Sequence, residues 1–335
     1  MGLKCCHAET HKVPIEKANL KMDFNRHERI VERRVPKVRR TAAAWFKRTA
    51  SLITDESIKI AIETGDPSSI SGIFEGLPTP APTDPNLRKS YEEMAALEAE
   101  VAEEIMTEIV EASLAGGKGA WGALPAMGVA LVGSFDVENP YVVPSAQKRV
   151  GWLIQEVRNG TNVGLQKAVA EVIERSYTQK LGWQRAAREI RGMVGLRPDQ
   201  VSAVNKLAAR LFEGGMTGER LTKRIARESA KRLKYRADMI ARTEMARAVN
   251  DGRHQAWKTA KDRNLFAGRE VFVEWVAGLT DRTCPICADL HGEQVPLGEE
   301  FSGSPLGEAE LSVYGEIPPI HPLCRCVTIL RIGGV

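Results

Sequence analysis

The sequence lacks any run of about 18 apolar residues, the length that a membrane-spanning helix requires. Its first residues also lack the apolar stretch of a secretory signal peptide, so we expect a cytoplasmic product with no membrane partner. Hydrophobic residues at 43% and charged residues at 27% are typical of a globular chain. The net charge of +4 is too small to imply nucleic-acid binding by itself.

Common catalytic motifs are also missing. The chain contains no Gly-rich phosphate loop, no Gly-x-Ser-x-Gly elbow and no His-Glu-x-x-His motif. His291-Gly292-Glu293 follows a Cys-x-x-Cys pair, but zinc deaminases carry these two elements in the opposite order. We therefore predict that the protein is not an enzyme and that His291 is an ordinary loop residue.

Cysteine is scarce, with six residues in the chain, yet four of them gather near its C-terminal end. Cys284 and Cys287 are separated by two residues, and Cys324 and Cys326 by one. Alternation along a strand would put the second pair on one face. Four sulfurs suit tetrahedral zinc, and His321 could replace one of them, so the choice between His321 and Cys324 as fourth ligand stays open. Structural zinc contributes on the order of 10 kcal/mol to folding, which suits a small unit.

Other readings of the cysteines are weaker. Cys284-Pro285-Ile286-Cys287 is similar to the dithiol of thioredoxin-like oxidoreductases, but that site opens a helix within a βαβ unit, which the sequence does not predict. Disulfides formed after release from the cell, or plain buried thiols, are the remaining alternatives. Cys5 and Cys6 are adjacent and cannot easily reach one ion, so we predict no second site there.

Most of the chain has the apolar periodicity of helices, and two β-rich runs, at 271–276 and 326–330, bracket the cysteines. The predicted fold class is α+β, predominantly α-helical with a small, zinc-stabilised C-terminal α+β domain. We expect Gly116-Gly117 to end one long helix and the glycines at 160 and 164 to interrupt another. The predicted parts are a basic helical region (1–76), a Pro-rich linker (77–86), an acidic helix with a Gly/Pro-rich connection (87–144), a helical region (145–264) and the C-terminal Cys/His domain (265–335).

Charge is unevenly distributed. Residues 26–48 and 219–247 are rich in Lys and Arg, whereas residues 86–112 carry a net negative charge. The first basic segment and the acidic one match in composition, so we expect them to pair within or between subunits. Contact with DNA or with an acidic partner, and plain solvation of the basic faces, are the alternatives.

Two motifs together resemble the phage Mu F-like head morphogenesis proteins, which are minor capsid proteins of tailed phages. One motif is the run Ala241-Arg242-Thr243-Glu244-Met245-Ala246-Arg247-Ala248-Val249-Asn250, and the other is Pro318-Pro319-Ile320-His321-Pro322-Leu323-Cys324-Arg325-Cys326 after the Cys-x-x-Cys pair. The resemblance extends from about Ser145 to Val335.

The resemblance implies a low-copy structural protein of the virion, associated with the portal and capsid interior, and present in the host cytoplasm during assembly. The implied partners are the portal protein, the major capsid or scaffolding protein and packaged double-stranded DNA, with several copies in each virion and passage with the DNA into the next host. The family's motif positions are Arg242, Glu244, Arg247 and Asn250 on the helix and Cys284, Cys287, His321, Cys324 and Cys326 after it.

From the resemblance we expect Arg242 or Glu244 to contact the C-terminal domain. The alternative function is that of a DNA-binding zinc-module protein acting in genome packaging or after ejection. Residues 288–316 contain acidic residues but no Lys or Arg, which argues against DNA binding by the zinc module.

Overall fold

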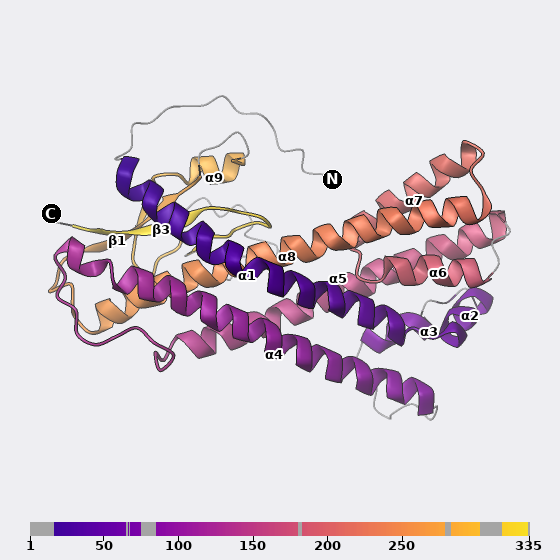
Figure 1. Cartoon of the computed structure of the whole chain (residues 1–335), viewed down its shortest axis with the longest axis horizontal. Coiled ribbons are helices and arrows are strands. Elements are labelled where there is room, and N and C mark those ends of the chain that lie inside the picture. The colour runs from indigo at the N-terminus through magenta and orange to yellow at the C-terminus, as the bar shows by residue number, and fades with distance from the viewer. Residues whose placement is uncertain are drawn as a thin grey trace. The chain divides into compact units, whose positions relative to one another are not determined.

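The computed structural model describes residues 17–64, 66, 68–74, 85–179, 183–278, 283–301 and 317–333. It is mostly helical with a small sheet near the C-terminus, which confirms the predicted fold class (Figure 1). The helices are α1 (Lys17–Leu52), α2 (Asp55–Thr64), α3 (Ser68–Ser71), α4 (Pro85–Trp121), α5 (Val142–Gln179), α6 (Trp183–Met193), α7 (Pro198–Glu213), α8 (Gly218–Asp262) and α9 (Pro285–Asp289). Short 3-10 turns η1 (Gly72–Phe74) and η2 (Leu124–Met127) and strands β1 (Val271–Val276), β2 (Gln294–Pro296) and β3 (Val327–Ile332) complete the described elements.

The chain forms two compact units, both discontinuous in sequence. Unit 1 is drawn from residues 1–37, 106–147 and 239–335, and unit 2 from residues 38–105 and 148–238, as far as these residues are described. The five-part division made from the sequence remains a prediction. Most of its Pro-rich linker, namely residues 77–84, and the cysteines at positions 5 and 6 lie outside the described residues.

Unit 1 contains the sheet, whose strand order is β2-β1-β3 with both pairings antiparallel. Alternation along β1 sends Val273 and Trp275 into the main core, where the Trp275 and Phe301 rings lie edge to face at 5.2 Å between centroids. The opposite face is covered by Phe24 at the start of α1, which packs against Val327. One face of this small sheet is therefore buried in the main core, and the other is partly covered, with Val276, Val327 and Ile329 buried there.

Unit 2 is built from helices alone among its described residues. Its largest fully buried side chains are aliphatic or Met: Ile58, Ile70, Ile105, Leu165, Ile190, Met193, Leu196, Leu221 and Ile225. Burying one such side chain contributes roughly 1.5–3 kcal/mol. Apolar helix packing therefore stabilises this unit.

The predicted helix breaks at glycines are wrong, because α4 continues through Gly116 to Trp121 and α5 is continuous through Gly164. A Cβ on Gly116 would lie 2.3 Å from the Val249 carbonyl oxygen of α8, and one on Gly164 would lie 1.9 Å from that of Leu196. Each glycine lets two backbones approach within one unit. Close packing, and not helix termination, accounts for these residues.

The predicted pairing of the basic and acidic segments is confirmed within the chain. In unit 1, Lys37 lies 2.5 Å from Glu108 and Arg34 lies 3.1 Å from the same carboxylate. In unit 2, Arg48 lies 2.6 Å from Glu100. Three basic residues of α1 are thus paired with carboxylates of α4. Within the described residues, none of the helices combines the length and apolar character of a membrane span.

Candidate metal centre

The first cysteine pair flanks the start of α9. Cys284 is the N-cap residue, and its sulfur accepts a hydrogen bond of 3.4 Å from the backbone N–H of Cys287. Pro285 occupies the first helical turn, where its missing N–H has no partner to lose. The local sequence therefore folds both thiols toward the same side of a tight turn after β1.

The second group of donors enters along the chain into β3. Cys324 and Cys326 are buried while Arg325 between them is exposed, as the predicted alternation requires. His321 precedes them, and its Nδ1 lies 2.9 Å from the Pro322 carbonyl oxygen. A carbonyl only accepts, so this bond places the proton on Nδ1 and leaves Nε2 as the free donor atom.

The structure brings all five predicted donors together. His321 Nε2 lies 3.2 Å from Cys284 Sγ and 3.1 Å from Cys287 Sγ, and Cys287 Sγ lies 3.7 Å from Cys324 Sγ. Two groups have all their donor atoms within 4.8 Å of one another, namely Cys284, Cys287 and His321, and Cys287, Cys324 and Cys326. Cys287 belongs to both groups, so it stands at the centre of the cluster.

These distances fit a tetrahedral zinc site. With Zn–S near 2.3 Å and Zn–N near 2.0 Å, the tetrahedral edges are about 3.8 Å between sulfurs and about 3.5 Å between sulfur and nitrogen. A Cys3His set of Cys284, Cys287, His321 and Cys324 would draw on both groups, so its four donor atoms do not all lie within 4.8 Å of one another, and Cys326 is a fifth donor beside them. A full set of four protein ligands leaves no open position for substrate, which favours a structural role.

The thiols and the imidazole of the cluster shift one another's pKa values through hydrogen bonds. Hydrogen bonding with Cys324 and Cys326 raises the pKa of Cys287, while the bond from Cys287 lowers the pKa of Cys324. The hydrogen bond with Cys324 raises the pKa of His321 to about 9. The sulfur and nitrogen atoms that share these protons are also the atoms that would bind a divalent cation. Binding of the cation would release the protons.

Helix α8 holds the backbone of the segment that carries the second donor group. Asn250 Nδ2 donates to the carbonyl oxygens of Pro318 and Cys326, each at 3.2 Å, and Arg247 donates to that of Pro319. Thr243 Oγ1 accepts from the Leu323 N–H at 3.0 Å.

We call Thr243, Arg247 and Asn250 the α8 clamp. The three residues are spaced by four and three, so they share one helix face. Arg247 and Asn250 are buried. The clamp therefore fixes four backbone groups on both sides of His321 and Cys324.

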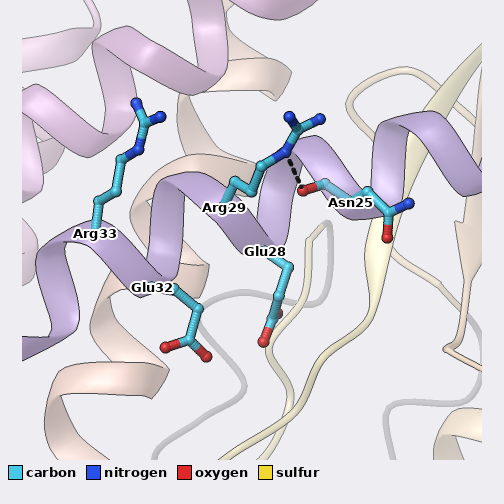
Figure 2. Close-up of a pocket in the computed structure, with 5 residues that line it drawn as sticks. All are labelled: Asn25, Glu28, Arg29, Glu32 and Arg33. Carbon is cyan, nitrogen blue, oxygen red and sulfur yellow. Dashed lines mark hydrogen bonds between the residues drawn. The ribbon is translucent and has the colours of Figure 1, made fainter.

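The predicted contact between the motif helix and the C-terminal segment exists, but Arg242 points elsewhere. Its Nη1 lies 2.7 Å from Glu32 and 3.9 Å from Glu28, both on α1. Figure 2 shows these carboxylates on one side of α1, at a hollow also lined by Asn25, Arg29 and Arg33. Glu244 is buried within α8. Sequence reasoning missed Thr243, although its spacing from Arg247 and Asn250 gave a signal.

His291 lies outside both donor groups. Its Nδ1 accepts the Ala277 N–H at 3.2 Å, and burial lowers its pKa, so it stabilises the end of β1 as a neutral side chain. The Cys-Pro-Ile-Cys run does open a helix, but the sheet beside it is antiparallel throughout, unlike a βαβ unit. All four cysteines of the cluster are free thiols. The geometry thus favours metal binding over a dithiol oxidoreductase.

Fold and site together define a helical protein with a small Cys/His module, able to hold a metal ion, docked on a long helix. Residues 203–329 match the family described as Phage Mu protein F like protein, so this part of the chain belongs to that family, as the sequence resemblance predicted. The match contains the α8 clamp and all five donors, but residues 145–202, which the resemblance included, lie outside it. No curated protein and no solved structure matches the chain.

Proposed function

We propose that this protein is a phage minor capsid protein that acts in head assembly as a structural, non-catalytic component. The observation that carries the proposal is the family match over residues 203–329, which coincides with the helix and the cluster that the structure joins. The proposed location is the capsid interior at the portal. The proposed partners are the portal protein and the major capsid or scaffolding protein.

Within this proposal the Cys/His cluster binds one structural zinc ion. Cys287 and Cys284 present their thiols from the α9 turn, while His321 and Cys324 come from the segment held by the α8 clamp. Zinc would join these two parts of the chain and stabilise the module. In this proposal the zinc site has only a structural role, and the assembly partners bind to the surfaces of the helices.

The test uses particles of the phage that carries this sequence. Quantitative mass spectrometry of purified heads should find the chain at a small fraction of the copy number of the major capsid protein. A phage that lacks the chain should make fewer functional heads, with rescue by the wild type but not by Cys287→Ser. Emptied heads that have lost the chain would indicate that it leaves with the DNA. Complete absence of the chain from heads and assembly intermediates would overturn the proposal.

Binding to packaged DNA is a second candidate function, favoured by one face of α8 in unit 2. Five exposed cations fall within one arc of this helix over about 21 Å: Arg220, Arg224, Arg227, Lys231 and Lys234. Such a stripe suits a phosphate backbone. By contrast, the metal module carries Asp289, Glu293, Glu299 and Glu300 in its described residues 283–301, so the zinc module is the less suitable DNA surface.

Salt dependence tests the DNA candidate. If the stripe neutralises five phosphates, the logarithm of the association constant should fall against that of salt with a slope of about −4 to −5. Arg227→Glu should weaken DNA binding and make the slope less steep. Cys284→Ser lies outside the stripe and should change neither the affinity nor the slope, as long as unit 2 stays folded. A slope near zero, or no binding at low salt, would remove this candidate.

A further inference from the structure

A groove lies within unit 2 between the second half of α1 and the first half of α8, with the end of α6 closing one side. Its volume is about 410 Å³. The lining residues divide into apolar and cationic side chains: Ala43, Phe46, Ala50, Val194, Ala230, Leu233 and Ala237 are apolar, and Arg39, Arg40, Lys47, Arg191 and Lys234 are cationic. Among the described residues, the lining includes no carboxylate.

The floor of the groove is apolar, and its edges carry small side chains. Phe46, Val194 and Ala237 are buried and form the base, while Ala43 and Ala230 are exposed at its edges on the two long helices. Alanines at both edges let an incoming helix approach closely. A nucleic-acid base could stack only on Phe46 among these lining residues, and Phe46 is only 4% exposed.

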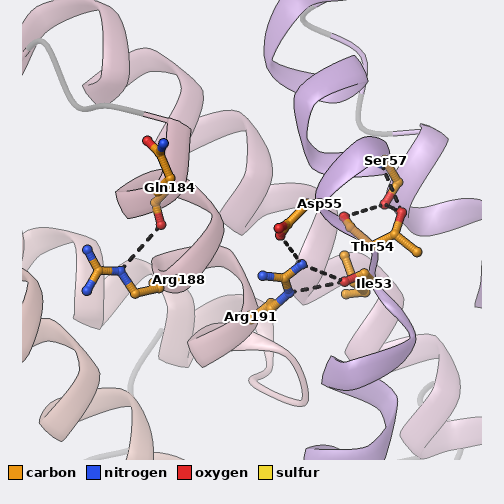
Figure 3. Close-up of polar contacts among 7 residues, drawn as sticks. All are labelled: Ile53, Thr54, Asp55, Ser57, Gln184, Arg188 and Arg191. Carbon is orange, nitrogen blue, oxygen red and sulfur yellow. Dashed lines mark hydrogen bonds and ion pairs between the residues drawn. The ribbon is translucent and has the colours of Figure 1, made fainter.

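The groove carries cations on all its sides. Arg40 and Lys47 lie on α1 and Lys234 lies on α8, all exposed. Arg191 of α6 is held in place, since it donates to the Ile53 carbonyl oxygen at 3.0 and 3.1 Å and to Asp55 at 2.5 Å (Figure 3). The rim is thus partly fixed before any partner binds.

A sixth cation lies directly beneath the floor. The Arg236 guanidinium carbon lies 5.1 Å from the centroid of the Phe46 ring, and its nitrogens donate to the Gly195 and Val157 carbonyl oxygens and to Thr161. Burial lowers its pKa to about 10, so it remains charged at neutral pH. A positive potential therefore reaches the apolar floor from below as well as from the rim.

We propose that this groove binds an acidic, amphipathic helix of a partner protein. A helix with small aliphatic residues on one face and Glu or Asp at its flanks would cover the floor and meet the cations together. DNA phosphates would meet the rim but would leave the apolar floor uncovered, which is why a protein partner fits better. The proposal rests on the proposed assembly function and names the surface through which one partner is bound.

The experiment uses the full chain and a synthetic 18-residue helical peptide with Ala and Leu on one face and Glu at both flanks. A peptide of the same composition in scrambled order, and an 18-base-pair DNA duplex, are the comparison probes. Two variants change the groove, Lys234→Glu at the rim and Ala230→Trp at the edge of the floor. Lys223→Glu is the matched control, because it reverses one exposed charge on α8 outside both the groove and the cationic stripe.

We expect the amphipathic peptide to bind, with each groove variant weakening binding about tenfold or more and the control weakening it by less than about twofold. The scrambled peptide should bind at least about tenfold more weakly. Equal effects of Lys223→Glu and Lys234→Glu would overturn the proposal in favour of unspecific attraction. Absence of peptide binding would also overturn the proposal. So would a DNA duplex that competes with the peptide, if Ala230→Trp weakens the binding of that duplex. Because the assay needs no phage particle, its failure would leave the head-protein proposal standing.

Discussion

The two units of this chain are stabilised by different means. Unit 2 consists of helices packed mainly through aliphatic side chains, with buried polar contacts of Arg175 and Arg236 between them. The sheet module of unit 1 has strands of only six, three and six residues and a five-residue helix. A small sheet of this kind is marginal by itself. It depends instead on a few precise contacts, namely the Cys/His cluster and the α8 clamp. The comparison shows that one chain can stabilise one part by apolar helix packing and another by a donor cluster and a few buried hydrogen bonds.

Removing the metal should have the largest effect and should affect the two units differently. Chelation of zinc, or Cys287→Ser, should remove on the order of 10 kcal/mol of binding free energy from the module. Hydrogen exchange measured by mass spectrometry should then accelerate in β1 and β3 but not in α6 and α7. Elemental analysis of the untreated protein should find about one zinc per chain.

The control for this experiment is Cys6→Ser, which leaves all five donors in place and should keep the metal. Freshly purified, reduced protein that holds no zinc but shows slow exchange in β1 would end the structural-metal model.

Glycine substitutions at the close helix contacts should come next in size. Gly252→Ala in unit 1 would place a Cβ 1.8 Å from the Ser113 carbonyl oxygen, and Gly164→Ala in unit 2 meets Leu196 in the same way. Each should destabilise its own unit by about 3 kcal/mol. Thermal melting with exchange mapping measures both effects.

Gly151→Ala is the matched control, because nothing lies within 4 Å of its added Cβ on α5. It should stabilise the helix by about 0.5–1 kcal/mol. An unchanged melting temperature for Gly252→Ala would contradict the close approach of α4 and α8.

Breaking the clamp should cost less than breaking a helix contact but should also weaken the metal site. Asn250→Ala removes two buried hydrogen bonds and leaves two carbonyl groups without their donor, a loss of about 2 kcal/mol. Zinc affinity should fall about ten- to a hundredfold, as for other supporting residues of metal sites.

Arg242→Ala provides the comparison on the same helix. Its ion pair with Glu32 is partly exposed, so its loss should cost less than about 1 kcal/mol and should leave zinc affinity unchanged. A competition titration with a zinc-binding dye separates the two variants. Equal losses of affinity would show that the helix as a whole, and not the clamp, supports the site.

The smallest effect concerns a buried carboxyl group and depends on pH. Burial is the main cause that raises the pKa of Asp251, although Ser145 and Gln255 donate to its Oδ2 at 2.7 and 2.5 Å. Between the unfolded pKa near 3.9 and the higher folded pKa, the folded state binds more protons. Stability contributed by this group is therefore lost as the pH rises through that window.

Asp251→Asn should remove this dependence. The difference in melting temperature between variant and wild type should shift in favour of the variant from pH 4 to pH 7. The matched control is Asp238→Asn, also on α8, whose partly exposed side chain pairs with Arg39; this variant should not gain on the wild type as the pH rises. A difference that is constant with pH would mean that Asp251 does not ionise within this window.

Element types and the donor cluster were predictable from the sequence because their signals are local. The run Val271–Val276 is β-branched and aromatic, and it forms β1 with the predicted bounds. The cysteine spacings likewise indicated the donors, since a Cys-x-x-Cys turn and strand alternation need no knowledge of the rest of the fold.

What could not be predicted depends on contacts between segments far apart in sequence. Gly116 and Gly164 have the local character of helix breakers, but a neighbouring backbone requires them inside helices. Two clamp residues, Arg247 and Asn250, were named from the sequence, but their partners were not. The carbonyl groups that Asn250 binds belong to residues about 70 positions later in the chain. The groove in unit 2 gives no sequence signal, since its lining comes from three helices.

The separation of the two donor groups has a consequence for how this protein can vary. Cys287 and His321 are 34 positions apart in the chain, yet their donor atoms are 3.1 Å apart. Closing a loop costs entropy that grows only logarithmically with its length, about 0.6 kcal/mol for each doubling. Outside β2 and the buried residues up to Phe301, the chain between the two donor groups can therefore gain or lose residues at little cost in loop-closure entropy. This makes the interval between them a place where new sequence can be acquired without redesign of the module.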